Sequence, residues 1–145
     1  MKQYSLVCAA MFATASIVAS ACVQAQGMRP VSISSADSAR AYKLDAARHI
    51  YATYPDKIYQ GKLPPLIHAV VVLEVALDDA GNVRDINTIR VPSHAPDVTV
   101  SVKDMIRRAS PLPAPSHIGG TRFTEIWLVD KSGRFQLDSL TEGQR

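Results

Sequence analysis

Cysteine is nearly absent from this 145-residue sequence, because only Cys8 and Cys22 occur and both lie near the N-terminus. The histidines are scattered, without a His-x-x-x-His spacing; they are His49, His68, His94 and His117. Structural zinc sites combine closely spaced cysteine and histidine ligands. We therefore predict no metal site and no cofactor, and we expect each histidine to have a structural or surface role.

Motifs of the common enzyme classes are also missing. The sequence has no glycine-rich phosphate loop and no serine in a nucleophile-elbow context. Asp78, Asp79 and Asp85 surround one turn, without the alternating ligands and terminal glutamate of an EF-hand. Glu74 and Glu125 fall on neighbouring expected strands, where we expect them to face solvent rather than to form a catalytic pair. We therefore predict a protein that is not an enzyme.

Clusters of one charge are absent as well. The 16 basic and 13 acidic residues are spread along the chain, and no basic run contains interleaved aromatic residues. Nucleic-acid-binding domains carry such basic patches together with a recognisable motif. We therefore expect no nucleic acid among the partners.

The longest apolar run lies at the N-terminus. Lys2 precedes a mainly apolar segment from Leu6 to Val18, and small residues follow up to Ala25. This order is typical of a secretory signal peptide. The run covers about 13 residues, whereas a membrane-spanning helix needs ~20. We predict a signal peptide over residues 1–25, a periplasmic or secreted mature protein, and no stable membrane span.

Two alternatives remain for this segment. Cys22 follows the small residues Ser20 and Ala21, as in a lipoprotein whose cysteine is acylated, although Ala19 stands where a larger aliphatic residue is usual. Alternatively, the apolar run is retained as an anchor. Membrane attachment depends on which of these three outcomes holds.

The mature chain is long enough for one compact domain. Cleavage after residue 25 leaves about 120 of the 145 residues, which is a common size for a single domain. We expect a flexible leader over residues 26–35, a domain over residues 36–140 and a tail over residues 141–145.

A β-hairpin is the clearest structural prediction. Apolar residues occupy the odd positions from Ile67 to Leu77, which is the period of a strand with one buried face. Residues 78–82 supply turn chemistry, with Gly81 able to adopt a positive φ. Apolar residues resume from Val83 to Val91, which predicts the second strand.

Two amphipathic helices flank the hairpin. Ser34 or Ser35 is positioned to cap a helix over residues 36–54, and Asp97 to cap a second helix over residues 98–109. Both segments carry apolar residues at spacings of three and four, which indicates one buried stripe on each helix.

Two strand-like runs complete the pattern, at Arg122 to Val129 and Arg134 to Leu137, separated by turn residues 130–133. The expected order is helix, strand, strand, helix, strand, strand. This pattern predicts an α+β fold with two layers. We expect a three- to four-stranded antiparallel sheet with both helices packed on one face.

Several short features occur in order along the chain: a Tyr-Pro pair, an alternating valine-rich strand, an Asp-x-Gly-x-Val turn, an amphipathic helix and a closing strand. Their residues are Tyr54, Pro55, Val71, Leu73, Val75, Leu77, Asp79, Gly81 and Val83, with ranges 98–108 and 123–129. In this combination the chain resembles the C-terminal domain of the TonB family, which includes the TolA-like end domains. The resemblance covers roughly Ala46 to Leu140 and implies the same α+β fold.

The chain also departs from the TonB pattern. Energy-transducing members keep an N-terminal transmembrane helix and a long proline-rich spacer, which residues 26–35 are too short to form. The second helix ends in Arg107-Arg108-Ala109-Ser110-Pro111 instead of an aromatic closure. We therefore predict a periplasmic protein-binding or envelope accessory module. The alternative is an energy transducer of TonB-dependent transport that retains its N-terminus as an anchor.

The resemblance also implies a binding mode, because family members that engage outer-membrane receptors accept a receptor peptide as an added strand. The expected partner is an envelope protein, such as a segment of an outer-membrane receptor, and open sheet edges also allow a homodimer. The candidate edge residues on the second strand are Arg84, Ile86, Thr88 and Arg90. Those on the closing strand are Thr124, Glu125, Ile126, Trp127 and Leu128.

The last part of the chain complicates the second of these edges. Residues 134–140 are expected to fold back onto the closing strand, so a partner can pair there only after they detach. A further hypothesis is a small-molecule or cell-wall-binding domain, in which the loop from Pro111 to Pro115 frames a groove with His117 and Arg122.

Overall fold

The computed structural model describes residues 32–144. The expected signal peptide, Cys22 and most of the expected leader lie outside these residues. No helix within residues 32–144 combines the length and apolarity needed to cross a membrane. The elements are α1 (Ala39–Thr53), the 3-10 helix η1 (Pro55–Lys57), β1 (Ala69–Leu77), β2 (Val83–Arg90), α2 (Pro96–Ala109), β3 (Arg122–Val129), β4 (Phe135–Leu137) and the 3-10 helix η2 (Asp138–Leu140).

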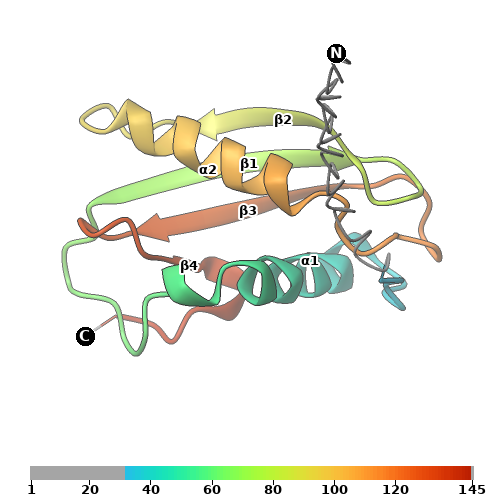
Figure 1. The fold of residues 1–145 in the computed structure, drawn as a ribbon, viewed down its shortest axis with the longest axis horizontal. Coiled ribbons are helices and arrows are strands. Elements are labelled where there is room, and N and C mark those ends of the chain that lie inside the picture. Colours follow the sequence, from blue (N-terminus) through green and yellow to red (C-terminus); the bar gives the residue numbers. More distant parts are fainter. Residues whose placement is uncertain (1–31, 145) are drawn as a thin grey trace, which may run out of the picture.

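The strands form one antiparallel sheet in the order β2-β1-β3-β4, so β1 and β3 are the central strands. Both helices lie on the same face, with α2 over β1 and β2 and α1 over β3 and β4 (Figure 1). In the part of the chain that the structure describes, the opposite face carries no helix. The predicted α+β fold, with two helices on one face and this element order, is confirmed, and the sheet has four strands.

The alternating pattern of the central strands creates the core. Val71, Leu73 and Val75 of β1 are each at most 1% exposed and pack beneath the helices. The odd-numbered residues of β3, including Trp127, are buried on the same side. Burying a side chain of this size contributes roughly 1.5–3 kcal/mol. The intervening residues, such as Val72, face the side without helices and are partly buried.

The β1–β2 turn has the predicted turn chemistry. The Asp78 carboxylate accepts hydrogen bonds from the Asn82 side chain and from the N–H groups of Asn82 and Ala80, which lower its pKa. Gly81 has a φ of +85°, and a Cβ at this position would lie 2.1 Å from the Leu112 carbonyl oxygen. Glycine is therefore required here both by the backbone conformation and by the close approach of the neighbouring loop.

Helix α1 begins later than predicted. Its N-cap is Ser38, whose Oγ accepts a hydrogen bond from the Ala41 N–H at 3.3 Å. Ser34, one of the two residues expected to cap the helix, is instead buried and donates to Asp45 Oδ2 at 2.6 Å. The prediction was wrong because several serines lie close together, and each of them is able to cap a helix. The contact of Ser34 with Asp45 is not visible from the spacing in the sequence.

Helix α2 begins at Pro96, which is earlier than predicted. Ala95 is its N-cap and forms no side-chain cap bond, so the predicted Asp97 cap was wrong. Proline is favoured at the first helical position because its φ is already helical and no partner is needed for an N–H there. Asp97 lies in the first turn, where its charge complements the helix dipole.

Both ends of the described chain join the fold outside the expected domain limits of 36–140. The Ser34 N–H donates to the Ala114 carbonyl oxygen at 2.9 Å, and the Ala114 N–H donates to the Ser32 carbonyl oxygen at 2.8 Å. Near the C-terminus, the Leu63 N–H donates to the Gly143 carbonyl oxygen at 2.9 Å. The folded unit therefore includes residues that we expected in the leader and the tail.

Candidate functional site

Strand β2 is the outermost strand on one side of the sheet and carries the first of the two predicted docking edges. Ile86 and Thr88 lie opposite Val75 and Leu73 of β1. The Leu77 N–H forms its hydrogen bond on the β3 side of β1. The N–H and C=O groups of odd-numbered β1 residues therefore point toward β3 and not toward β2. Ile86 and Thr88 are therefore non-hydrogen-bonded partners of β1, and their own N–H and C=O groups point outward.

Two backbone N–H groups of β2 already have side-chain acceptors. Asp85 Oδ1 accepts from the Ile86 N–H at 2.8 Å, and Ser110 Oγ accepts from the Val83 N–H at 3.1 Å. Within residues 32–144 no side chain accepts from the Thr88 N–H. Acidic side chains on an exposed edge oppose unwanted strand pairing. Thr88 is therefore the most accessible position for strand pairing on this edge.

The predicted β2 residues do not share one surface. Ile86 is 8% exposed and packs into the core, and Thr88 is partly buried on the same face. Arg84 is exposed and lies 3.2 Å from an Asp78 carboxylate oxygen. Arg90 is exposed at the opposite end of the strand. A strand paired with this edge would contact the backbone and the two arginines at its ends.

The second predicted edge, on β3, is closed where β4 pairs with it. Trp127 lies opposite Leu137, and Leu128 lies opposite Gln136. The Trp127 ring is fully buried, with its centroid 4.6 Å from that of Phe135. Trp127 and Leu128 therefore cannot pair with a partner strand while β4 is in place.

Glu125 is the main correction to the sequence analysis, because it is 1% exposed rather than facing solvent. Its Oε1 accepts from the Ile126 N–H at 3.0 Å and lies 3.4 Å from Lys43 Nζ of α1. Its Oε2 accepts from the Ser139 hydroxyl of η2 at 2.6 Å. Burial raises the pKa of this carboxyl group, and the three contacts only partly offset that shift. Glu125 thus links β3 to α1 and η2, and it is the acceptor for the Ile126 N–H.

Glu74 and Glu125 do not form a carboxylate pair, because they lie on opposite faces of the sheet. Glu74 is opposite Thr124 on the face without helices, and its Oε1 is 3.2 Å from a guanidinium nitrogen of Arg122. Thr124 itself is exposed, and β4 ends before reaching it. Of the predicted β3 residues, Thr124 alone presents an exposed side chain at this edge.

Strand β4 is itself covered on its outer side. The Tyr59 N–H donates to the Phe135 carbonyl oxygen at 2.9 Å. Gln136 Nε2 donates to the carbonyl oxygens of Tyr59 and Gly61, at 2.8 and 2.7 Å. Phe135 and Leu137 are fully buried. Opening the β3 edge therefore requires the loss of these contacts and of about 1.5–3 kcal/mol of burial for each of the two apolar side chains.

The proline loop packs against α1. The Tyr42 hydroxyl donates to the Pro113 carbonyl oxygen at 2.7 Å, and Pro113 is buried. Burial, together with the nearby Asp45 carboxylate, raises the pKa of Tyr42. His117 is exposed, whereas Arg122 lies on the face of the sheet away from α1. The structure therefore does not bring the loop, His117 and Arg122 together around one groove.

His68 and His94 come together, although their spacing in the sequence shows no motif. Their ring centroids are 5.5 Å apart, with an angle of 78° between the rings. They line a cavity of about 270 Å³ at the Arg90 end of β2. Within residues 32–144, no group of three or more histidine, cysteine, aspartate or glutamate residues is arranged to hold a metal ion.

Comparisons of the chain with protein-family models, curated proteins and solved structures found no match. The resemblance to the TonB C-terminal domain therefore stays a prediction from the residues that carry it. What can be said of function follows from the geometry of the sheet edges.

Proposed function

We propose that this protein is a non-enzymatic protein-binding module of the bacterial cell envelope, secreted to the periplasm and similar to the TonB C-terminal domain. It binds its partner by adding a strand to the outer edge of β2. The observation that carries this proposal is the difference between the two sides of the sheet. The β4 side is covered by residues 58–61, whereas β2 is the last strand on its side.

The β2 edge needs little rearrangement to accept a strand. The Thr88 N–H and C=O groups already point outward. A partner carbonyl oxygen can replace Asp85 Oδ1 as the acceptor for the Ile86 N–H. Exchanging one hydrogen bond for another changes the free energy little, because a typical bond contributes only about 0.5–1.5 kcal/mol net.

The proposal is tested with two matched proline variants. Thr88→Pro removes an outward N–H from β2, and proline is tolerated on edge strands at such positions. Thr124→Pro makes the same change on β3, beyond the end of β4. Thermal unfolding of both variants verifies that each is folded.

Tagged mature protein is then used to capture partners from envelope extract. We expect a partner that is captured by the wild type and by Thr124→Pro but lost with Thr88→Pro. Retention of that partner by folded Thr88→Pro contradicts strand addition at β2. Loss with Thr124→Pro alone assigns the docking edge to β3.

The location of the protein is tested by measuring the intact mass of the chain isolated from cells. Secretion with signal-peptide cleavage predicts a chain that begins at Gln26. A chain that begins with an acylated Cys22 indicates a lipoprotein. A chain that keeps residues 1–25 supports the alternative of an anchored energy transducer.

A further inference from the structure

We propose that the cavity at the Arg90 end of β2 binds an acidic side chain of the partner strand. This inference rests on the proposed function and adds the chemistry of the partner to it. The cavity has a volume of about 270 Å³ and lies between the start of β1 and the loop from β2 to α2. Its lining residues are Ile67, His68, Val70, Arg90, Val91, Pro92, Ser93 and His94.

The cavity exists because the two strands separate there. Pairing between β1 and β2 ends at Val72 opposite Arg90, although β1 itself begins at Ala69. Even-numbered residues of β1 direct their backbone groups toward β2. The N–H and C=O groups of Val70 therefore face this gap, where no β2 residue is paired with them. An N–H group that faces such a gap is a donor for an anion.

None of the charged and polar side chains around the cavity is acidic. Arg90 contributes a guanidinium group, Ser93 a hydroxyl and His68 an imidazole ring as hydrogen-bond donors, whereas the Nε2–H of His94 is taken by the His68 carbonyl oxygen. The neighbouring cavity that contains the carboxylates of Asp97 and Asp130 shares only His68 with this one. The lining is therefore suited to a negatively charged group.

Arg90 differs from other arginines of the sheet. Arg84 pairs with Asp78, and Arg122 pairs with Glu74. Among the ion pairs of residues 32–144, none includes Arg90. An incoming carboxylate can therefore form a bidentate contact with Arg90 without displacing an existing partner.

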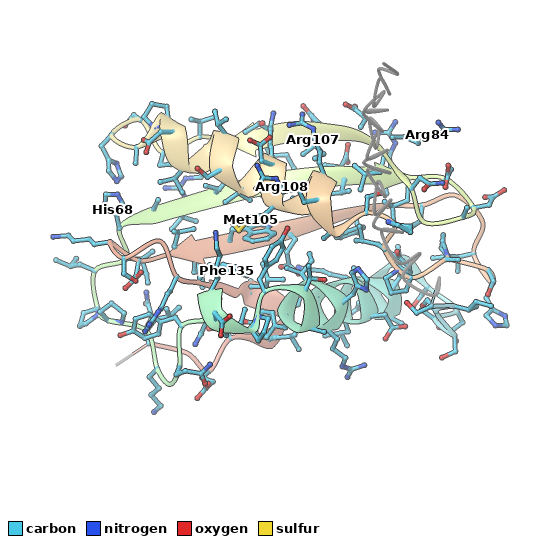
Figure 2. The ribbon with its side chains drawn as sticks, in the orientation of Figure 1. His68, Arg84, Met105, Arg107, Arg108 and Phe135 are labelled. Atoms are coloured by element: carbon cyan, nitrogen blue, oxygen red, sulfur yellow. The ribbon has the colours of Figure 1, made fainter. Side chains whose placement is uncertain are left out.

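His94 fixes one wall of the cavity. Its Nε2 lies against the His68 carbonyl oxygen, which can only accept, so this nitrogen carries the hydrogen. The His68 and His94 rings then stand nearly perpendicular to one another. Figure 2 shows His68 at one end of the sheet and Arg84 near the other, so the cavity lies far from the paired arginine.

Apolar walls favour a carboxylate on an aliphatic stem over a free inorganic anion. Ile67, Val70 and Val91 line the cavity beside the donors and can contact the methylene groups of a glutamate or aspartate. A strand added along β2 passes Arg90, which belongs to β2 and also lines the cavity, so a side chain of the added strand can reach its guanidinium group. We therefore assign to the partner an acidic residue at this end.

The test uses small probes, so that it does not depend on strand addition. N-acetyl-glutamate amide carries the side-chain carboxylate without charged termini, and N-acetyl-glutamine amide is its uncharged counterpart. Each is titrated into the ¹⁵N-labelled mature protein at constant pH and ionic strength, while backbone amide shifts are followed. Inorganic phosphate serves as a third probe.

We expect saturable shifts at Val70 and His94 with the glutamate probe only. Arg90→Gln weakens that binding about tenfold, as the loss of one charge-assisted contact predicts. Arg134→Gln is the control, because Arg134 is exposed in the β3–β4 turn and does not line the cavity. Equal shifts with the glutamine probe, tighter binding of phosphate, or equal affinity of the Arg90→Gln and Arg134→Gln variants each overturn the assignment.

The failure of this inference is distinguishable from the failure of the proposed function. If strand addition at β2 is wrong, Thr88→Pro keeps the captured partner, whatever the glutamate probe does. If only the carboxylate site is wrong, Thr88→Pro loses the partner, while the glutamate probe produces no shifts at the cavity.

Discussion

Replacing Glu125 tests how the C-terminal segment is held on the sheet. Glu125→Ala removes the acceptor of the Ile126 N–H and of the Ser139 hydroxyl, together with the partner of Lys43. Hydrogen bonds to a charged group contribute roughly 1.5–3 kcal/mol each, so the two bonds alone correspond to about 3–6 kcal/mol. This sum leaves out the contact with Lys43.

Two features of the site reduce this figure. Burial of the carboxylate opposes its ionisation, which is why its pKa is raised despite the three contacts. The Lys43 side chain is 26% exposed and stays partly hydrated when its partner is removed. We therefore expect Glu125→Ala to lower the free energy of unfolding by about 2–4 kcal/mol. Glu125→Gln keeps an acceptor oxygen and the side-chain volume, so its loss is expected to be about 1–2 kcal/mol.

Urea unfolding followed by Trp127 fluorescence measures these losses, because the single tryptophan is fully buried against Phe135. Glu74→Ala is the matched control on the opposite face of the sheet. Its ion pair with Arg122 is exposed and contributes at most about 1 kcal/mol. Hydrogen exchange of the β4 amides should also accelerate in Glu125→Ala and not in Glu74→Ala. If the two alanine variants are equally stable, Glu125 does not hold the C-terminal segment.

Two further predictions concern the turn and the pH dependence. In thermal unfolding, Gly81→Ala should lower the free energy of unfolding more than Gly133→Ala does. Both glycines have a positive φ, which costs a residue with a Cβ about 1–2 kcal/mol. Only a Cβ at Gly81 also meets the Leu112 carbonyl oxygen. Equal losses would show that the Leu112 loop moves away freely. Because the pKa of Glu125 is raised in the folded state, that state holds a proton which the unfolded chain has already released at intermediate pH. The free energy of unfolding of the wild type relative to that of Glu125→Gln should therefore fall as pH rises from the ordinary glutamate pKa to the raised value, and then level off. If the stability difference between the two proteins stays constant over this range, the prediction is wrong.

The order of the elements and the faces of the central strands follow from the residue pattern alone. Apolar residues at alternate positions specify which side of β1 is covered, because successive strand residues point to opposite faces. The same reasoning correctly places Val71 and Leu73 in the core beneath the helices. It also predicts the β1–β2 turn, because aspartate and glycine have strong local preferences.

The contacts that define the candidate sites depend on residues that are distant in the sequence. Glu125 occupies an odd position of β3, so the alternation itself places it on the helix side, as its burial confirms. The buried position of this carboxylate depends on its contacts with Lys43 and Ser139. No local sequence pattern connects these two residues to Glu125. The contact between His68 and His94 also joins residues that are distant in the sequence, because it forms where β1 and β2 separate.

The free energy that a docking strand must overcome separates the two predicted edges. Pairing with β3 along Trp127 and Leu128 requires β4 to leave, which exposes Phe135 and Leu137 at a cost of about 3–6 kcal/mol for the pair. Pairing with β2 along Arg84 to Arg90 requires the exchange of one hydrogen bond at Ile86 and leaves the bond from the Val83 N–H to Ser110 in place. Since 1.4 kcal/mol corresponds to a tenfold change in affinity, the same strand is expected to bind β2 about 100- to 10,000-fold more tightly than β3. A partner that nevertheless docks on β3 must recover that difference through contacts beyond the strand pairing, and its binding would then weaken in Thr124→Pro and persist in Thr88→Pro.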